Sequence, residues 1–343
     1  MNPLMLPLDT LRSLVEAPPR RVVITTHQNP DADALGSSLG WAGYLRKKGH
    51  SVTIITPTDY PRYLTWMQGN DDVIAYSDRT RTRAAAAVAE ADVIYCLDFN
   101  ALARIGDLEP MVRASSAQKV MIDHHLQPEN FADLVFSDPS AAATAQMVYE
   151  LIAALGDERT IDRHIGECLY AGFMTDTGSF RHPSTNAAVH RIAANLIELG
   201  VNTNRVHRLI FDNVSLDRLR FLGYVLSEKM VVLPEYRVAY IAVTGEELKR
   251  FRSQTGDTEG VVNYALSVEN VVMAAILVDR GNEVKISFRS VGDFSVNELA
   301  RQYFSGGGHR NAAGGKTHLS LADTVARFLS VLPEFREKLL ATE

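Results

Sequence analysis

Three apolar segments of the sequence, 22–24, 92–97 and 119–122, each run into acidic or imidazole residues. Short continuous apolar runs of this kind are typical of strands that are buried on both faces of a parallel sheet. The carboxyl ends of such strands share one edge of the sheet, where ligands bind in open α/β folds. The residues at these ends are His27, Asp31 and Asp33, then Asp98, and then Asp123, His124 and His125. The pattern therefore predicts an α/β fold with a polar cluster at one sheet edge.

The same residues have a simpler interpretation as independent turn and cap residues. Asp and Asn are frequent in turns, and Asp33 could cap the helix predicted for 34–48. Clustered carboxylates, however, repel one another and need a compensating cation. Asp176 lies at a further apolar-to-turn junction and would add to the negative charge. The pattern as a whole favours a metal site over a set of separate caps.

The number and type of candidate ligands indicate the chemistry. About seven ligands are too many for one tetrahedral zinc ion, but they suit two octahedral ions that share a carboxylate. Mixed carboxylate and imidazole donors select a hard or borderline divalent ion. Two such ions about 3.5–4 Å apart hold the attacking and leaving oxygens of a phosphoryl displacement. Phosphate-ester hydrolysis is therefore the predicted reaction.

Length and composition narrow the class of protein. A chain of 343 residues exceeds the usual size of one domain, so two domains are expected. Its 46% hydrophobic and 22% charged residues are typical of a globular protein. The net charge of −6 offers no basic face for long duplex nucleic acid. A small anionic substrate is still compatible with this charge, because bound cations reverse the local field.

The cysteines and the N-terminus predict the location of the protein. Cys96 and Cys168 lie in apolar segments and are too few for a disulfide framework, which favours reduced thiols and a cytoplasmic protein. The stretch 1–15 lacks a positive region and carries Asp9, so it is a poor signal peptide. No uncharged apolar run approaches the roughly 20 residues that a membrane helix needs.

The hydrophobic periodicity predicts a first domain over 1–200, a helical connector over 201–229 and a smaller α/β domain over 230–343. The first domain should hold a mostly parallel sheet flanked by helices. In the last domain, a hairpin is expected with its turn at Gly281-Asn282. The helices predicted beside these are 8–17, 82–91, 142–155, 161–173, 186–199, 246–252, 260–267, 296–304 and 320–340, and the strands are 51–55, 134–136, 231–233, 236–243, 271–279 and 283–289. The segment 60–76 has no clear pattern.

A glycine run near the C-terminus, Gly306, Gly307 and Gly308, precedes His309. Such a run frees the backbone to present successive N–H groups to an anion, and the histidine can donate to phosphate. The alternative is a flexible helix C-cap. Arg289 ends a predicted strand in the same domain, where it could form a bidentate phosphate contact or a surface ion pair. These five residues are the predicted substrate-binding group.

Five motifs together resemble a known family. They are Asp31-Ala32-Asp33, the strand end at Asp98, Asp123-His124-His125, Thr175-Asp176-Thr177-Gly178 and Gly306-Gly307-Gly308-His309. Their order and spacing resemble the DHH/DHHA1 phosphoesterases over nearly the whole chain. The length and two-domain plan are most similar to the nanoRNase group, which combines oligoribonuclease and 3′-phosphoadenosine-5′-phosphate phosphatase activities. One departure is Phe99-Asn100, where relatives frequently carry small hydroxyl residues.

The resemblance implies two manganese ions in each active site, with Mg²⁺ or Co²⁺ as the alternatives. The implied ligands are His27 and Asp31 for one ion, Asp33, His124 and Asp176 for the other, and Asp98 as a bridge between both. His125 would face the scissile phosphate as an electrostatic aid or a proton donor. Asp123 would orient the histidine pair, as residues behind a ligand usually do.

The implied activity is the hydrolysis of very short single-stranded RNA to nucleoside monophosphates and of nucleoside bisphosphates such as 3′-phosphoadenosine-5′-phosphate to AMP. An exopolyphosphatase or pyrophosphatase, or a hydrolase of linear dinucleotides, could use the same metal cluster. Manganese pyrophosphatases, however, share the first domain and lack the Gly-Gly-Gly-His loop. A nucleotide-binding regulator is the non-enzymatic alternative, against which the intact ligand positions argue. No membrane partner is expected, and a dimer remains open.

Overall fold

The computed structural model describes residues 5–342. The first four residues, which belong to the stretch assessed as a poor signal peptide, and the last residue lie outside this range. The chain divides into two compact units, Met1–Asn213 and Val214–Glu343. Each unit has a sheet and helices, so the predicted two-domain α/β class is confirmed. Within the described residues, no helix is long and apolar enough to cross a lipid bilayer.

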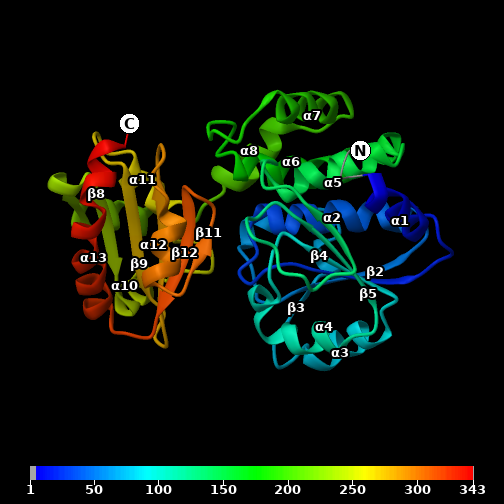
Figure 1. The fold of residues 1–343 in the computed structure, drawn as a ribbon, viewed down its shortest axis with the longest axis horizontal. Coiled ribbons are helices and arrows are strands. Elements are labelled where there is room, and N and C mark those ends of the chain that lie inside the picture. The colour runs from blue at the N-terminus through cyan, green and yellow to red at the C-terminus, as the bar shows by residue number, and fades with distance from the viewer. Residues whose placement is uncertain (1–4, 343) are drawn as a thin grey trace. The chain divides into compact units, whose positions relative to one another are not determined.

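The first unit is built on a sheet of six parallel strands in the order β3-β2-β1-β4-β5-β6 (Figure 1). The strands are β1 (Arg21–Thr25), β2 (Ser51–Thr56), β3 (Ile74–Ala75), β4 (Val93–Leu97), β5 (Gln118–Asp123) and β6 (Leu134–Ser137). All residues of the central strand β4 are buried, because both faces of the sheet are covered. This burial explains why the strand reads as a continuous apolar run.

The strand order reverses between β1 and β4. From β1 the chain moves outward to β2 and β3, then returns to β4 and continues to β5 and β6 on the other side. The two strands are direct neighbours, with Thr25 beside Cys96. Connections that leave neighbouring strands in opposite directions open a crevice at their carboxyl ends, where ligands bind in this class of sheet. The topology therefore selects the ends of β1 and β4 as a binding site.

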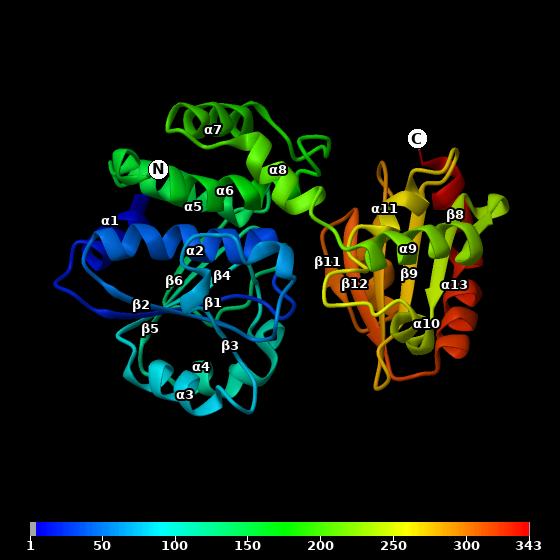
Figure 2. The same ribbon diagram turned by 180° about the vertical axis from the view of Figure 1, so that it is seen from behind.

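Helices cover both faces of this sheet. In Figures 1 and 2, α2, α5 and α6 lie over one face, and α3 and α4 lie over the other. The helices of this unit are α1 (Met5–Val15), α2 (Ala32–Lys47), α3 (Arg81–Glu90), α4 (Glu109–Ala114), α5 (Thr144–Ala154), α6 (Arg163–Asp176), α7 (Ala187–Glu198) and α8 (Thr203–Phe211). Alternate residues of β4 enter two different apolar clusters: Tyr95 packs on the side of α2, whereas Ile94 and Cys96 pack on the side of α3.

Helices α2 and α6 pack at very short range, and glycine makes this approach feasible. A Cβ atom on Gly36 of α2 would lie 2.4 Å from the carbonyl oxygen of Cys168 in α6. A Cβ atom on Gly172 of α6 would lie 2.7 Å from Oδ1 of Asp33. Contacts this close leave no room for a methyl group. The crossing brings Asp176, the last residue of α6, to the helix start that carries Asp33.

The second unit holds a mixed sheet in the order β11-β12-β10-β9-β8-β7, in which β8 and β9 run parallel and the other neighbouring pairs are antiparallel. Residues of α12 and α13 pack on one face, and residues of α9, α10 and α11 pack on the other. The strands are β7 (Met230–Leu233), β8 (Val238–Val243), β9 (Met273–Asp279), β10 (Val284–Ser290), β11 (Gly307–Gly308) and β12 (Ala312–Thr317). The helices are α9 (Leu216–Tyr224), α10 (Gly245–Arg250), α11 (Val261–Leu266), α12 (Val296–Tyr303) and α13 (Leu321–Ala341).

The structure tests several of the predicted elements. The hairpin around Gly281 is confirmed by the antiparallel pairing of β9 with β10. Strands β11 and β12 have no sequence signal, because they consist mostly of glycine and alanine and lack β-branched residues before Thr317. Pairing with the hairpin holds them in the sheet. In the first unit, the unassigned segment 60–76 forms two short 3₁₀ turns and the edge strand β3.

Replacing Gly36 by alanine should destabilise the first unit, because the new methyl group would meet the Cys168 carbonyl oxygen. Overpacking of this kind costs about 1–3 kcal/mol of unfolding free energy, which urea denaturation followed by circular dichroism would measure. Gly223→Ala in α9 is the matched control, since nothing lies within 4 Å of a Cβ atom there. This control should be neutral or gain up to about 1 kcal/mol. Equal stability of the two variants would contradict the close approach.

Candidate metal centre

The turn after β1 supplies the first polar residues of the site. His27 is buried just beyond the strand. Asp31 is the N-cap of α2, and its Oδ1 atom accepts hydrogen bonds from the N–H groups of Asp33 and Ala34 at 3.0 Å. The alternative that Asp33 caps this helix is therefore wrong, because Asp31 has that role. The other oxygen of Asp31, Oδ2, lies 4.0 Å from Nε2 of His27.

The Asp33 carboxylate is fully buried and caps a different helix. Its Oδ2 atom accepts the N–H of Thr144 at 2.7 Å, and its Oδ1 atom accepts the N–H of Ala145 at 2.8 Å. Helix α5 has no side-chain cap of its own. The carboxylate from α2 therefore satisfies two N–H groups at the positive end of the α5 dipole, which links the two helices.

Asp98 follows β4 in the left-handed conformation, with φ at 66°, which Asp and Asn adopt more readily than most residues. Its N–H donates to the Ile122 carbonyl of β5 at 3.0 Å. Its carboxylate faces in two directions: Oδ2 lies 3.2 Å from Nε2 of His27, and Oδ1 lies 3.5 Å from Nε2 of His124. The Thr144 hydroxyl donates to Oδ1 at 2.9 Å. Asp98 thus connects the turn after β1 with the turn after β5.

Backbone carbonyl groups set the tautomers of two histidines. Nδ1 of His27 lies 2.8 Å from the Gln28 carbonyl oxygen, and Nδ1 of His124 lies 3.2 Å from that of Ala141. A carbonyl oxygen only accepts, so each Nδ1 carries the hydrogen and Nε2 carries the lone pair of the neutral ring. Metal-binding histidines are usually oriented in this way.

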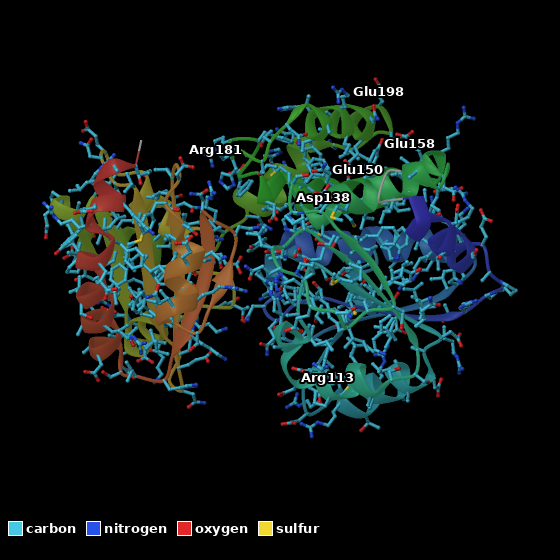
Figure 3. All side chains as sticks on the ribbon, in the orientation of Figure 1. Arg113, Asp138, Glu150, Glu158, Arg181 and Glu198 are labelled. Carbon is cyan, nitrogen blue, oxygen red and sulfur yellow. The ribbon has the colours of Figure 1, made fainter. Side chains whose placement is uncertain are left out.

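A turn around Asp138 holds the Ala141 carbonyl group in place. Asp138, which is labelled in Figure 3, lies in the loop between β6 and α5. Its carbonyl oxygen accepts the N–H of Ala141 at 3.1 Å, and its Oδ1 atom accepts the N–H of Ser140 at 2.9 Å. Its own N–H donates to the carbonyl oxygen of Asp123 at the end of β5. The orientation of His124 therefore depends on a turn anchored to the sheet.

His125 is oriented by a carboxylate. Its Nδ1 atom lies 2.7 Å from Oδ1 of Asp123, and its backbone N–H donates to Oδ2 of the same residue at 3.1 Å. In enzymes, such a carboxylate fixes the tautomer of an imidazole and stabilises its protonated form. The rings of His124 and His125 meet edge to face at 74°, so the neighbouring imidazoles lie in different planes.

Among the groups of side chains whose ligand atoms lie within 4.8 Å of one another, two contain the residues for which the resemblance implies metal binding. They are His27, Asp31 and Asp98 in one group and Asp33, His124 and Asp176 in the other. In the second group, Nε2 of His124 lies 3.4 Å from Oδ2 of Asp176 and 3.9 Å from Oδ2 of Asp33. Asp98 connects the groups through Oδ1. The structure thus brings together the six residues for which the resemblance implies metal binding.

The charge balance of these groups fits divalent cations. Burial and the charges of Asp98 and Asp176 raise the pKa of Asp33 well above its usual range, and burial together with Asp31 raises the pKa of Asp176 to about 8. Although burial lowers it, the pKa of His124 rises to about 10 because of its hydrogen bond with Asp98. The clustered carboxylates therefore need added positive charge, either as protons or as metal ions. The mixed donor set suits a borderline divalent ion.

Comparison with known proteins identifies the family. The sequence matches the N-terminal domain of the DHH family over residues 21–173 and the DHHA1 domain over residues 236–338. The bifunctional oligoribonuclease and PAP phosphatase NrnA of Thermus thermophilus is 34% identical over 328 residues, which are 95% of this chain and 91% of that protein. The chain belongs to the DHH/DHHA1 phosphoesterase family. The resemblance seen in the sequence is thus confirmed, and so is the prediction of a phosphoric-ester hydrolase.

Two solved structures share the fold of this DHH/DHHA1 protein. An exopolyphosphatase-related protein from Bacteroides fragilis is 39% identical and covers 99% of both chains, with a TM-score of 0.92. RecJ from Thermus thermophilus in complex with Mn²⁺ is 13% identical, and the match covers 97% of this chain and 55% of that chain with a TM-score of 0.51. At this identity, the RecJ likeness shows a common fold alone.

In the DHHA1 domain, the glycine run forms an edge of the sheet. Gly307–Gly308 is strand β11, which pairs antiparallel with β12. The N–H of Gly306 donates to the Ala300 carbonyl oxygen at 3.2 Å, and the N–H of His309 donates to that of Ala312 at 2.8 Å. The expectation that the N–H groups of the glycine run face an anion is therefore wrong at Gly306, since a bond within the domain uses this group.

Arg289 lies in β10 near the same end of this sheet. It is paired with Ala312 of β12, the residue whose carbonyl oxygen accepts the N–H of His309. Its Nη1 atom donates to the Phe288 carbonyl oxygen at 2.9 Å. The strand pairing thus places Arg289 beside the loop that follows the glycine run.

Thr144 has no motif that would mark it in the sequence, yet it contacts both Asp33 and Asp98. The one local signal is the run Ala141-Ala142-Ala143 before α5, which offers no capping side chain. A buried helix start without its own cap needs a partner from elsewhere in the chain. Which residue provides it follows only from the packing of α2 against α5.

Thr144→Val should weaken metal binding, because it removes the hydroxyl that holds Oδ1 of Asp98 while the N–H to Asp33 remains. Loss of a supporting hydrogen bond typically lowers metal affinity about 10–100-fold, which competition with a fluorescent chelator for Mn²⁺ would measure. Thr144→Ser retains the hydroxyl and should bind metal like the parent protein. Equal affinity of the Val and Ser variants would show that the hydroxyl has no such role.

Proposed function

We propose that this chain is a manganese-dependent phosphoesterase that hydrolyses very short oligoribonucleotides to nucleoside monophosphates and 3′-phosphoadenosine-5′-phosphate to AMP. The observation that carries the proposal is the position of Asp98, whose two carboxylate oxygens face two separate groups of Asp and His side chains. A carboxylate in this position suits a bridge between two ions. The name of the Thermus thermophilus relative, which matches over most of its length, supports the substrate class.

The proposed ligands are His27 and Asp31 for one ion, Asp33, His124 and Asp176 for the other, and Asp98 for both. The two imidazoles favour manganese, because magnesium prefers oxygen ligands and retains its own waters. Two such ions, when bound, act as Lewis acids on a phosphate group and lower the pKa of the attacking water. The hydrogen bonds to Asp33 and Asp98 from the start of α5 hold these carboxylates in position for the ions.

We propose that His125 acts on the phosphate and is not a ligand. Its Nδ1–H donates to Asp123, so Nε2 is the nitrogen that exchanges a proton with a phosphate oxygen or its leaving group. Asp123 holds the ring orientation and stabilises the ring when it is protonated. The pair thus supplies a proton-transfer group beside the proposed metal ligand His124.

We propose Arg289, Gly306, Gly307, Gly308 and His309 as the substrate-binding group of the DHHA1 domain. The side chains of Arg289 and His309 offer hydrogen-bond donors suited to phosphate. Strand β10, which carries Arg289, and strand β11, which directly precedes His309, both pair with β12. Binding energy from contacts away from the scissile phosphate lowers the reaction barrier as well as tightening binding.

The second candidate function is hydrolysis of polyphosphate or pyrophosphate, which the name of the Bacteroides fragilis structure suggests. It would use the same metal centre and differ in the group that the DHHA1 domain holds. The buried free cysteines Cys96 and Cys168 support a reducing, cytoplasmic location. A dimer remains a prediction.

A product time course on di- to pentaribonucleotides with Mn²⁺ tests the proposal, with 3′-phosphoadenosine-5′-phosphate, pyrophosphate and polyphosphate assayed in parallel. We expect nucleoside monophosphates and AMP to accumulate, and we expect slower turnover when Mg²⁺ replaces Mn²⁺. Asp98→Asn should lose most of the turnover without unfolding, because Asn also tolerates the left-handed backbone at this position. Asp107→Asn, at an exposed position, is the matched control. Phosphate release from polyphosphate without RNA cleavage would favour the second candidate.

His125→Ala should lower turnover by about 10²–10⁴-fold, the usual contribution of a general acid or base. Elemental analysis should still find two metal equivalents, because the proposed ligands are unchanged. His164→Ala, which removes an exposed histidine of α6, is the matched control and should turn over like the parent protein. Loss of one metal equivalent in His125→Ala would make this residue a ligand instead.

A further inference from the structure

The short helix η3 (Leu102–Leu108) lies between the two turns that carry His27 and His125. On one side, the N–H of Gln28 in the turn after β1 donates to the Arg104 carbonyl oxygen at 2.8 Å. On the other side, the N–H of Leu102 donates to the carboxylate of Glu129 at 3.3 Å, in the segment that follows β5. Hydrogen bonds to the turn after β1 and to the segment after β5 therefore fix the backbone around residue 104.

Arg104 is not one of the buried residues of η3. Leu102, Ile105 and Leu108 recur at every third residue and are fully buried in the apolar cluster beneath. Arg104 lies between two of these anchors and is half-buried. The backbone at Gly106 is not helical, so η3 consists of two short turns. Leu102 and Ile105 anchor the first turn in the cluster, and residue 104 lies between these anchors on the side away from the core.

The positive charge of Arg104 affects the pKa of both His27 and His125. Burial lowers the pKa of His125. The hydrogen bond that its ring donates to Asp123 acts to raise this pKa, and the Arg104 charge acts to lower it. For His27, burial and the Arg104 charge also act to lower the pKa, although the hydrogen bond with Asp98 raises it overall. A cation that acts on both rings lies at the edge of the metal centre.

The guanidinium group of Arg104 has no hydrogen bond or ion pair within residues 5–342 that the structure describes. A guanidinium group carries five N–H donors in a planar fork that matches carboxylate and phosphate oxygens. A half-buried group of this kind ordinarily has a carboxylate or carbonyl partner. Arg104 therefore presents a positive charge and a set of donors to the centre.

The charges around the centre show what kind of ligand would take these donors. Its carboxylates are Asp31, Asp33, Asp98, Asp123 and Asp176. Two divalent ions would offset four of these five negative charges, and the Arg104 guanidinium supplies the fifth positive charge. An anionic substrate would otherwise meet a site of net negative charge.

We propose that Arg104 binds a non-bridging oxygen of the scissile phosphate, on the His125 side of the metal centre. The inference rests on the proposed function and deepens it by naming a residue of the first domain that recognises the phosphate. The ligand class is a phosphate mono- or diester. A planar guanidinium that donates two hydrogen bonds to phosphate also fixes the orientation of the group.

The test compares Arg104→Gln with Arg113→Gln. Arg113, labelled in Figure 3, is an exposed arginine of α4 that pairs with Glu109, so it controls for the loss of one positive charge. With Mn²⁺ and a diribonucleotide, kcat/KM of Arg104→Gln should fall about 100-fold, the effect of removing one preorganised donor to a reacting phosphate or oxyanion. Inhibition by AMP should weaken as well. Metal content should stay at the level of the parent protein.

Arg104→Lys keeps the charge without the fork and should recover part of the loss. If Arg104→Gln retains the kcat/KM of the control, the inference is wrong while RNA cleavage by the parent protein upholds the proposed function. Loss of a metal equivalent or of the circular dichroism signal in both Arg104 variants would assign the residue a structural role and overturn the inference. If the parent protein cleaves none of the phosphate esters, the proposed function itself fails.

Discussion

The buried carboxylate of Asp98 is the group on which the metal centre depends. It follows β4 in a left-handed conformation, and one of its oxygens lies beside His27 while the other lies beside His124. An ionised carboxylate without partners would be very unfavourable at this depth. Neighbours that meet this need come from the ends of two other strands, because the sheet order places β4 between β1 and β5. The position of the centre therefore follows from the strand order.

Helices of one sheet face then complete the arrangement. Asp33 begins α2 but caps α5, and the contact of Gly36 with the α6 backbone brings Asp176 to the same region. These contacts hold the carboxylates before any ion binds. Because these side chains are already held in place, metal binding costs little conformational entropy. The cost is a buried cluster of like charges, and burial together with the neighbouring carboxylates raises the pKa of Asp33 and Asp176.

Proteins that share this fold are named for different phosphate-containing substrates. One relative is named as an oligoribonuclease and PAP phosphatase, and one structural neighbour is named as exopolyphosphatase-related. All these named substrates share a phosphate group, so a common metal centre suits each of them. Selection among them must come from residues outside the shared ligands. In this chain, the proposed groups are Arg104 in the first domain and Arg289 and His309 in the DHHA1 domain.

The sequence by itself was sufficient for the class of the fold and for the residues at the strand ends. Buried parallel strands are apolar throughout, so the residues that end them, such as Asp98 and the run 123–125, stand out locally. Only the tertiary structure decided that Asp31 caps α2 while Asp33 reaches Thr144, 111 residues later. It also decided that the glycine run pairs as β11. Periodicity reports how a single segment is buried, whereas these contacts depend on which segments the packed chain brings together.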